Sequence, residues 1–355
     1  MRRLSQAGSV AMLFVALMSL RVGVAFAGVN LWTRHGPEGG PVSSLAIDPV
    51  TPATLYSGTR GGVFKSVNGG GSWTAINSGL TSTNVSALAI DPVTPATVYT
   101  GTNGGGVFKS VDAGGSWTAA NTGLTSTAVA ALAIDSGTPA TVYAGTYGSG
   151  VFKSLNGGGI WTAVNSGLTS LSVPALAIDP VTPATLYAGT SGGGVFKSAN
   201  GGGSWAPANT GLTTTAVNAL AIDPVTPATL YAATFGGGVF KSLNGGGVWT
   251  AVNTGLTSTL FSALAIDPAT PATIYAGTAP FPGGGGVAVF KSVNGGGSWT
   301  AVNTGLTASF ALALAIDPAT PATLYAGTSY APLSYGGGVF KSVNGGEAGS
   351  RLILA

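Results

Sequence analysis

Carboxylates are the first candidates for catalytic or metal-binding chemistry, and the chain has ten of them. Seven are the aspartate of a repeated Ala-Ile-Asp sequence: Asp48, Asp91, Asp135, Asp179, Asp223, Asp267 and Asp317. Proline follows six of these and serine follows Asp135, so we expect each carboxylate to cap a turn. A weak cation site in each repeat is the alternative. A catalytic pair needs two carboxylates in different environments, which copies of one position do not provide.

The other three acids are scattered. Glu38 lies near His35, the single histidine, in a segment rich in glycine and proline. Asp112 lies in a glycine-rich turn, and Glu347 lies near the C-terminus. The repeat spacing does not place any two of these acids across a cleft, so the sequence favours a protein without a catalytic pair or triad.

The lysines also recur once in each repeat. All seven lysines stand in copies of Val-Phe-Lys-Ser, and we interpret them as solvated charges at strand edges. The glycine runs precede strands and not helices, so they do not predict phosphate loops. We expect no cofactor and no metal.

The N-terminus has the pattern of a secretory signal peptide over residues 1–27, with Arg2 and Arg3 before an apolar run and small residues at 25–27. We expect export to the periplasm or the extracellular space; an uncleaved anchor is the alternative.

Removal of the three arginines of this leader leaves 13 − 3 = 10 basic residues against ten acids. The mature chain is then neutral, which gives no support to a nucleic-acid partner. The absence of cysteine excludes disulfides and thiol chemistry.

A repeat of about 44 residues organises the rest of the chain. Leu-Ala-Ile-Asp begins at Leu45, Leu88, Leu132, Leu176, Leu220, Leu264 and Leu314. Each unit contains four short runs of strand character, which in one unit span 116–121, 129–135, 141–146 and 150–154. Four strands repeated seven times predict an all-β, seven-bladed β-propeller with four antiparallel strands per blade. A parallel β-solenoid is the alternative.

The two ends of the repeat array complement each other. The seventh unit stops before any tryptophan, whereas the segment 30–36 matches the tryptophan strand of the other units. We therefore expect the propeller to span 28–346 and its last blade to be completed by the N-terminal strand, closing the ring as a monomer. Residues 347–355 form a C-terminal tail.

The turns before the tryptophans carry a family likeness. Residues 110–117, Ser-Val-Asp-Ala-Gly-Gly-Ser-Trp, match the Asp-box pattern, and asparagine replaces the aspartate in five close copies. The residues of these turns are Ser66, Asn68, Gly70, Trp73, Ser110, Asp112, Gly114, Trp117, Asn156, Trp161, Asn200, Trp205, Asn244, Trp249, Asn294 and Trp299. The chain over 31–346 thus resembles Asp-box (BNR) propellers, which include sialidases, xyloglucan-cleaving glycoside hydrolases, the sortilin ectodomain and the photosystem II assembly factor.

The resemblance implies that these turns are structural and peripheral. The acid or amide would accept backbone hydrogen bonds, and the tryptophan would pack over its own hairpin. A sialidase would also need three arginines and a Tyr–Glu nucleophile pair. The arginines beyond the leader are Arg34, Arg60 and Arg351, so the family's catalytic residues do not carry over.

Differences between the repeats gather in the loop between the second and third strands. This loop should lie on the face opposite the box turns, together with connections in which Leu171, Phe261 and Phe310 vary. It expands at 279–288 and 329–338. As ligand-binding residues we predict Arg60, Tyr147, Phe235, Phe281, Tyr330 and Tyr335. Sequence drift in a tolerant loop is the alternative.

The sequence therefore favours an exported, non-catalytic propeller scaffold that binds a polysaccharide or protein partner. A glycoside hydrolase of the sialidase or xyloglucanase type is the alternative. A recently amplified repeat without a settled role is a third interpretation.

Overall fold

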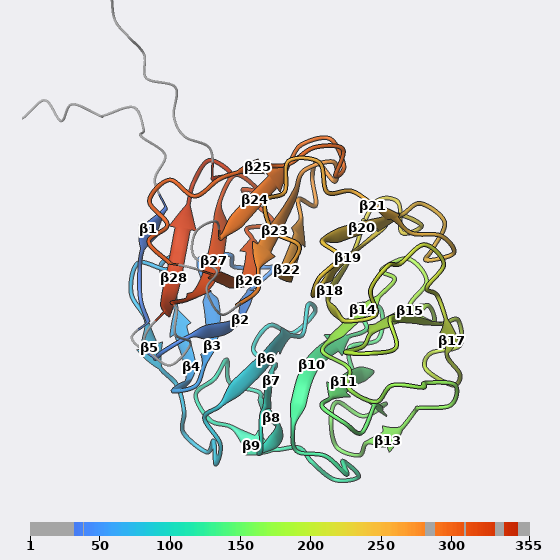
Figure 1. Cartoon of the computed structure of the whole chain (residues 1–355). Helices are drawn as coiled ribbons and strands as arrows, with labels where there is room; N and C mark the ends of the chain where they lie inside the picture. Colours follow the sequence, from blue (N-terminus) through green and yellow to red (C-terminus); the bar gives the residue numbers. More distant parts are fainter. Residues whose placement is uncertain (1–31, 38, 281–287, 309, 331–336, 347–355) are drawn as a thin grey trace, which may run out of the picture.

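A computed structural model describes residues 32–37, 39–280, 288–308, 310–330 and 337–346. These residues form seven four-stranded antiparallel sheets arranged in a ring (Figure 1). The predicted β-propeller is confirmed. The leader, 1–27, and the tail, 347–355, lie outside the described residues and stay predictions.

Each sheet runs from the centre of the ring to its rim. The innermost strands are β2 (Val42–Ile47), β6 (Val85–Ile90), β10 (Val129–Ile134), β14 (Ala175–Ile178), β18 (Val217–Ile222), β22 (Phe261–Ile266) and β26 (Phe310–Ile316). The second strands are β3 (Leu55–Thr59), β7 (Val98–Thr102), β11 (Val142–Thr146), β15 (Leu186–Gly189), β19 (Leu230–Thr234), β23 (Ile274–Thr278) and β27 (Leu324–Ser329). The third strands are β4 (Gly62–Ser66), β8 (Gly106–Ser110), β12 (Val151–Ser154), β16 (Val195–Ser198), β20 (Val239–Ser242), β24 (Val289–Ser292) and β28 (Gly337–Ser342). The outermost strands are β5 (Thr74–Ala75), β9 (Thr118–Ala119), β13 (Thr162–Ala163), β17 (Ala206–Pro207), β21 (Thr250–Ala251), β25 (Thr300–Ala301) and β1 (Thr33–Arg34).

We number the blades 1 to 7 by their innermost strands, so blade 1 is β2–β5 and blade 7 is β26–β28 with β1. In blade 7 the fourth strand comes from the other end of the chain. Thr33 pairs with Lys341 and Arg34 pairs with Phe340 in antiparallel register. Figure 1 shows β1, in blue, beside β28, in red.

The outermost strands are shorter than the sequence predicts. The expected run 116–121 contains only Thr118–Ala119 as a strand. These residues are exposed, whereas every residue of the second strand β11 is buried. An outer edge of two residues offers few free backbone groups, so it gives little template for pairing with another chain.

The hydrophobic core lies between blades and not within them. One cluster joins Tyr99 and Val107 of blade 2 to Val142, Phe152 and Trp161 of blade 3, all at most 2% exposed. Each blade therefore buries its apolar side chains only against a neighbour, as repeat units do.

The tryptophans cross between blades. Trp161 of blade 3 donates its indole Nε1–H to the carbonyl of Ala120, which follows the outer strand of blade 2, at 2.8 Å. Its backbone N–H donates to Thr122 of the same segment, also at 2.8 Å. The same indole bond to the preceding blade is made by Trp32, Trp117, Trp205, Trp249 and Trp299. The indole also lies against its own box turn, since a Cβ on Gly158 would stand 3.8 Å from Trp161 Cζ2. What the sequence did not predict is the hydrogen bond that joins two blades.

We predict that Trp161→Ala lowers the free energy of unfolding by about 3–5 kcal/mol, because it empties an inter-blade core and leaves a carbonyl unpaired. Urea denaturation followed by fluorescence measures this. Ile160→Ala is the matched control, since the neighbouring Ile160 side chain is 58% exposed. Equal losses in the two variants would contradict the inter-blade role of the indole.

Candidate functional site

Asp112, the single acid among the box turns, is held by its own turn. Its Oδ1 accepts from Ser110 Oγ at 2.7 Å and from the Ser116 backbone N–H at 2.9 Å. Its Oδ2 accepts from Ser116 Oγ at 2.8 Å. The hydrogen bond from Ser110, followed by those from Ser116, lowers the pKa of this exposed carboxyl to about 2.

Asparagine makes the same turn in other blades. Asn68 Oδ1 accepts from Ser66 Oγ and from the Ser72 backbone N–H, each at 2.9 Å. Its Nδ2 then donates to Ser72 Oγ at 3.0 Å, where Asp112 accepts instead. The serine hydroxyl can rotate to serve either partner, so the turn does not require an acid.

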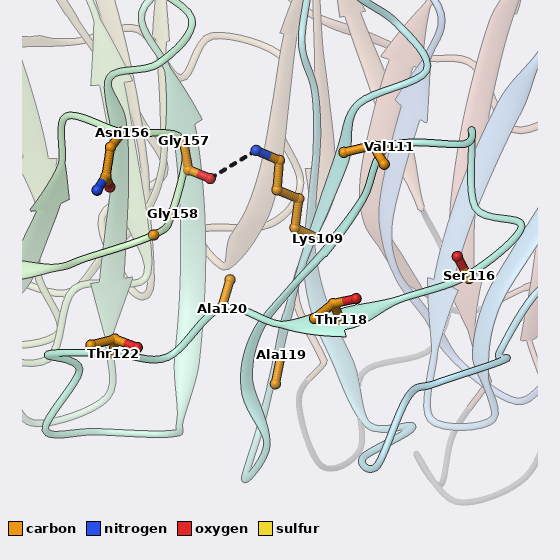
Figure 2. Close-up of a pocket in the computed structure, with 11 residues that line it drawn as sticks. Lys109, Val111, Ser116, Thr118, Ala119, Ala120, Thr122, Asn156, Gly157 and Gly158 are labelled. Carbon is orange, nitrogen blue, oxygen red and sulfur yellow. Dashed lines mark hydrogen bonds between the residues drawn. The ribbon is translucent and has the colours of Figure 1, made fainter.

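The lysines dock each box turn onto the preceding blade. Lys109 of blade 2 donates from Nζ to the carbonyl of Gly157 in the blade 3 turn at 3.0 Å (Figure 2). The same Nζ lies 5.3 Å from the centroid of the Tyr99 ring, and Tyr99 Oη donates to the same carbonyl at 3.1 Å. Equivalent lysine bonds are made by Lys65, Lys153, Lys197, Lys241 and Lys341. The interpretation of these lysines as solvated edge charges is therefore wrong.

Figure 2 shows the groove that this contact leaves at the rim between blades 2 and 3, with a volume of about 300 Å³. Lys109 is its single charged lining residue, and the rest are Val111, alanine and hydroxyl side chains, and the turn 156–159. A similar groove of about 430 Å³ lies between blades 4 and 5. Neither lining contains a carboxylate or a histidine.

The repeated aspartates cap turns beside the box turns. Asp91 Oδ1 accepts from the backbone N–H of Val93 at 2.9 Å and of Thr94 at 3.0 Å. Corresponding pairs hold Asp48, Asp135, Asp179, Asp223, Asp267 and Asp317. The Ala113 N–H of the box turn bonds to Ala96 of the aspartate turn, so both turns share one end of the blade. We call this end of the propeller the turn face.

The remaining candidates for catalysis are dispersed. Arg34 donates to the carbonyl of Gly337 at 3.0 Å, and Arg60 is exposed at the opposite end of blade 1. His35 Nε2 lies 2.7 Å from Thr33 Oγ1, and burial together with Lys341 lowers its pKa. Glu38, Glu347 and Arg351 lie outside the described residues.

The opposite end, which we call the loop face, carries the loops between second and third strands. Here Tyr147 is 49% exposed and Phe235 is 44% exposed. The backbone N–H of Tyr147 donates to Ala128 and that of Phe235 donates to Ala216, each at 2.9 Å. These bonds fix the loops on their scaffold. Tyr147 and Phe235 stand in blades 3 and 5, so blade 4 separates them.

The other predicted binding residues differ in placement. Tyr330 is half-buried, and its Oη lies 3.3 Å from Thr307 Oγ1. Phe281 and Tyr335 lie outside the described residues. Phe261 and Phe310, expected on this face, are buried, and the Phe261 ring packs edge-on against Phe290 with centroids 5.9 Å apart. Strand β22 turns the Phe261 side chain into the core between blades 5 and 6.

Leu171 belongs to the loop face although it was not among the predicted binding residues. It is 40% exposed, and its carbonyl accepts from Gly148 N–H at 3.0 Å, which places it beside the Tyr147 loop. The sequence signal was a leucine where the equivalent connections carry threonine or, in one repeat, serine.

The axis of the ring forms a narrow channel of about 240 Å³. Alanine and leucine of the innermost strands line most of it, with Ser44, Pro174 and Asn218 as departures. No carboxylate lines this channel. Within the described ranges, no three His, Asp or Glu side chains gather as metal ligands would, and no helix has the length and apolar character to cross a bilayer.

Comparison with known proteins gives a likeness of fold. No protein-family model and no curated sequence matches the chain. Among solved structures, it is similar to a GH74 xyloglucanase from Xanthomonas campestris (TM-score 0.70, 19% identity, 89% of this chain and 54% of that one). It is also similar to a GH74 enzyme from Niastella koreensis (0.67, 23%, 88% and 54%). A third is YCF48 bound to D1 peptide (0.65, 15%, 92% and 97%). The chain thus spans about half the length of the GH74 structures and nearly all of YCF48.

We predict that Asp112→Asn leaves the melting temperature at pH 7 nearly unchanged, because the amide can make the same bonds. The folded-state pKa lies below the ordinary value of 3.8, so ionised Asp112 stabilises the fold above about pH 4. This contribution is lost as the pH falls towards 2. Melting curves between pH 7 and pH 2 should therefore show a steeper acid loss in the wild type than in the variant. Parallel curves would contradict the bonded carboxylate.

We predict that Lys197→Met lowers the free energy of unfolding by about 1.5–3 kcal/mol, because Lys197 Nζ donates to Gly245 O at 2.9 Å. The substitution also removes the contact of Lys197 Nζ with the Tyr187 ring, whose centroid lies 5.4 Å from that atom. Chemical denaturation measures this. Arg60→Met removes an exposed cation on the loop face and should have little effect. If the two variants were equally stable, Lys197 would be a solvated charge after all.

Proposed function

We propose that this chain is an exported propeller without catalytic activity that binds a polysaccharide or a protein partner on its loop face. One observation carries the proposal. Every described carboxylate accepts backbone hydrogen bonds in its own turn on the turn face, whereas the loop face presents Tyr147, Leu171 and Phe235 to solvent.

The loop face has the properties of a binding platform. Exposed aromatic rings can stack on sugar rings or pack against peptide side chains. Backbone bonds to the adjoining connections hold the Tyr147 and Phe235 loops in place, which reduces the entropy lost on binding. Arg60 is the charged side chain described among these loops, so apolar contact should dominate the interaction.

Export rests on the leader-like residues 1–27, and a complete ring of seven blades supports a monomer. Periplasmic and extracellular locations both fit. The likeness to YCF48 bound to D1 peptide favours a protein partner, and the likeness to GH74 enzymes favours a polysaccharide. Both likenesses are of fold, so a binding experiment has to decide.

We predict that Tyr147→Ala/Phe235→Ala weakens partner binding by about tenfold or more, because it removes the exposed aromatic contacts. The triple variant at Phe281, Tyr330 and Tyr335 tests the two expanded loops in the same way. Mature protein would be screened on glycan arrays, with xyloglucan included, and on peptide arrays, with melting temperatures measured alongside. Hits would be quantified by calorimetry.

Val67→Ala/Val111→Ala is the matched control, since these side chains are 66% and 69% exposed on the turn face. It should leave binding unchanged. Equal binding by the loop-face variants would overturn the proposed site. Hydrolysis of xyloglucan or of a sialoside by the wild type would instead favour the alternative that this protein is a glycoside hydrolase.

A further inference from the structure

The seam between blades 7 and 1 lacks a bond that other seams have. Trp117, Trp161, Trp205, Trp249 and Trp299 each donate the indole N–H and the backbone N–H to the preceding blade. Trp73 of blade 1 occupies the same position against blade 7. Its Nε1 is buried without a hydrogen-bond partner among the described residues, and the Trp73 side chain is only half-buried. An unpaired buried donor weakens the interface that contains it.

The apolar packing at this seam is also incomplete. Phe64 of blade 1 is half-buried, whereas its equivalents, such as Phe108 and Phe152, are at most 1% exposed. Ser57 is fully buried, and its Oγ lacks a partner among the described residues. The equivalent position is alanine in five blades, as at Ala144, where it packs against the preceding blade. The core cluster between blades 7 and 1 contains no fully buried phenylalanine or tryptophan.

The cause lies in the connection that crosses the seam. Between β1 and β2 it has seven residues, 35–41, whereas the connection between β5 and β6 has nine, 76–84. The longer connection supplies Asn77, whose Oδ1 accepts from Val63 N–H at 2.8 Å, and Leu80, which packs into the core between blades 1 and 2. The segment 35–41 contains neither asparagine nor leucine.

Trp32, the residue before β1, ties the N-terminal strand to blade 6. Trp32 is 3% exposed, and its Nε1 donates to Val302 O of the blade 6 connection at 2.6 Å. Its backbone N–H donates to Thr304 O at 2.9 Å. Across the seam itself, Lys341 Nζ and Tyr325 Oη donate to Gly69 O at 2.9 and 3.1 Å.

We propose that the ring opens at the seam between blades 7 and 1, and that Trp32 is the latch that holds it shut. Release of Trp32 leaves β1 held to β28 by the ladder pairs of Thr33 and Arg34 and by the backbone bonds of His35 and Gly36 to Val339. Blade 1 can then separate from blade 7, since the indole bond found at other seams is missing there. The seam between blades 6 and 7 loses the Trp32 bonds in this step, but Tyr275 and Val289 of blade 6 still pack in one core with Leu324 and Phe340 of blade 7. The remaining seams keep the bonds of their own tryptophans.

Hydrogen exchange measured by mass spectrometry tests this opening, because the repeats provide internal controls. Residues 62–66, 106–110 and 150–154 share the sequence Gly-Val-Phe-Lys-Ser, so their valine, phenylalanine, lysine and serine amides have equal intrinsic exchange rates. Amides of β1, β28 and β4 should exchange about tenfold faster than those of β8, β9, β12 and β13. Equal rates, or fastest exchange at another seam, would overturn the proposal.

Three conservative substitutions sharpen the test. Trp73→Phe removes an unpaired N–H and should leave the unfolding midpoint unchanged, whereas Trp161→Phe removes a bonded one and should lower it. Ser57→Ala should slow exchange at β1, β28 and β4 by about tenfold, because it removes a buried unpaired hydroxyl. Equal effects of the two tryptophan substitutions would overturn the proposal, and so would unchanged exchange in Ser57→Ala.

Trp32→Phe tests the latch directly. It should speed exchange in β1, β28 and β4 together while leaving β12 and β13 unchanged. An effect confined to β1, or spread over all blades, would overturn the role of Trp32. If this variant does not fold, the comparison of Trp73→Phe with Trp161→Phe still decides whether the seam is weaker.

Discussion

The backbone carbonyl of each box turn, where lysine and tyrosine of the preceding blade converge, is the contact on which this ring depends. Tyr99 Oη and Lys109 Nζ both donate to Gly157 O, and Trp161 of the same turn donates back to Ala120 O. The donors are side chains but the acceptors are backbone carbonyls. The contact therefore depends on the shape of the turn and not on its residue types. Asparagine can replace aspartate freely for this reason, whereas lysine, tyrosine and tryptophan recur at their positions in the repeats.

Much of the architecture was predictable because it follows from period and turn chemistry. The spacing of the repeats gave the number of blades, and the residues 110–117 gave the turn that ends the third strand. What a repeat cannot reveal is which neighbour a side chain meets. Lys109 and Trp161 read as local features in the sequence, yet each bonds to another blade. The expectation that Phe261 lies on the loop face was wrong for the same reason. Variation among the repeats marked its position, but only the register of β22 shows that its side chain is buried.

The candidate site was predictable only in part. Differences between the repeats in the loop from second to third strand placed Tyr147 and Phe235 on the loop face. Leu171 was noted there as a variable position but not as a binding residue. The physical contrast between the two faces explains where the chain can vary. On the turn face, carboxylates, amides and carbonyls are bonded within the ring. On the loop face the side chains of Tyr147, Leu171 and Phe235 are exposed, so a change there should disturb the ring less than a change on the turn face.

The pairing of β1 with β28 sets the order in which the molecule can be finished. Thr33 and Lys341 are separated by 308 positions, so β1 can pair with β28 only after the whole segment between them is present. Until then blade 1 lacks blade 7, and Trp32 has no core to enter. The ring is thus a fold that is completed in one late, long-range step.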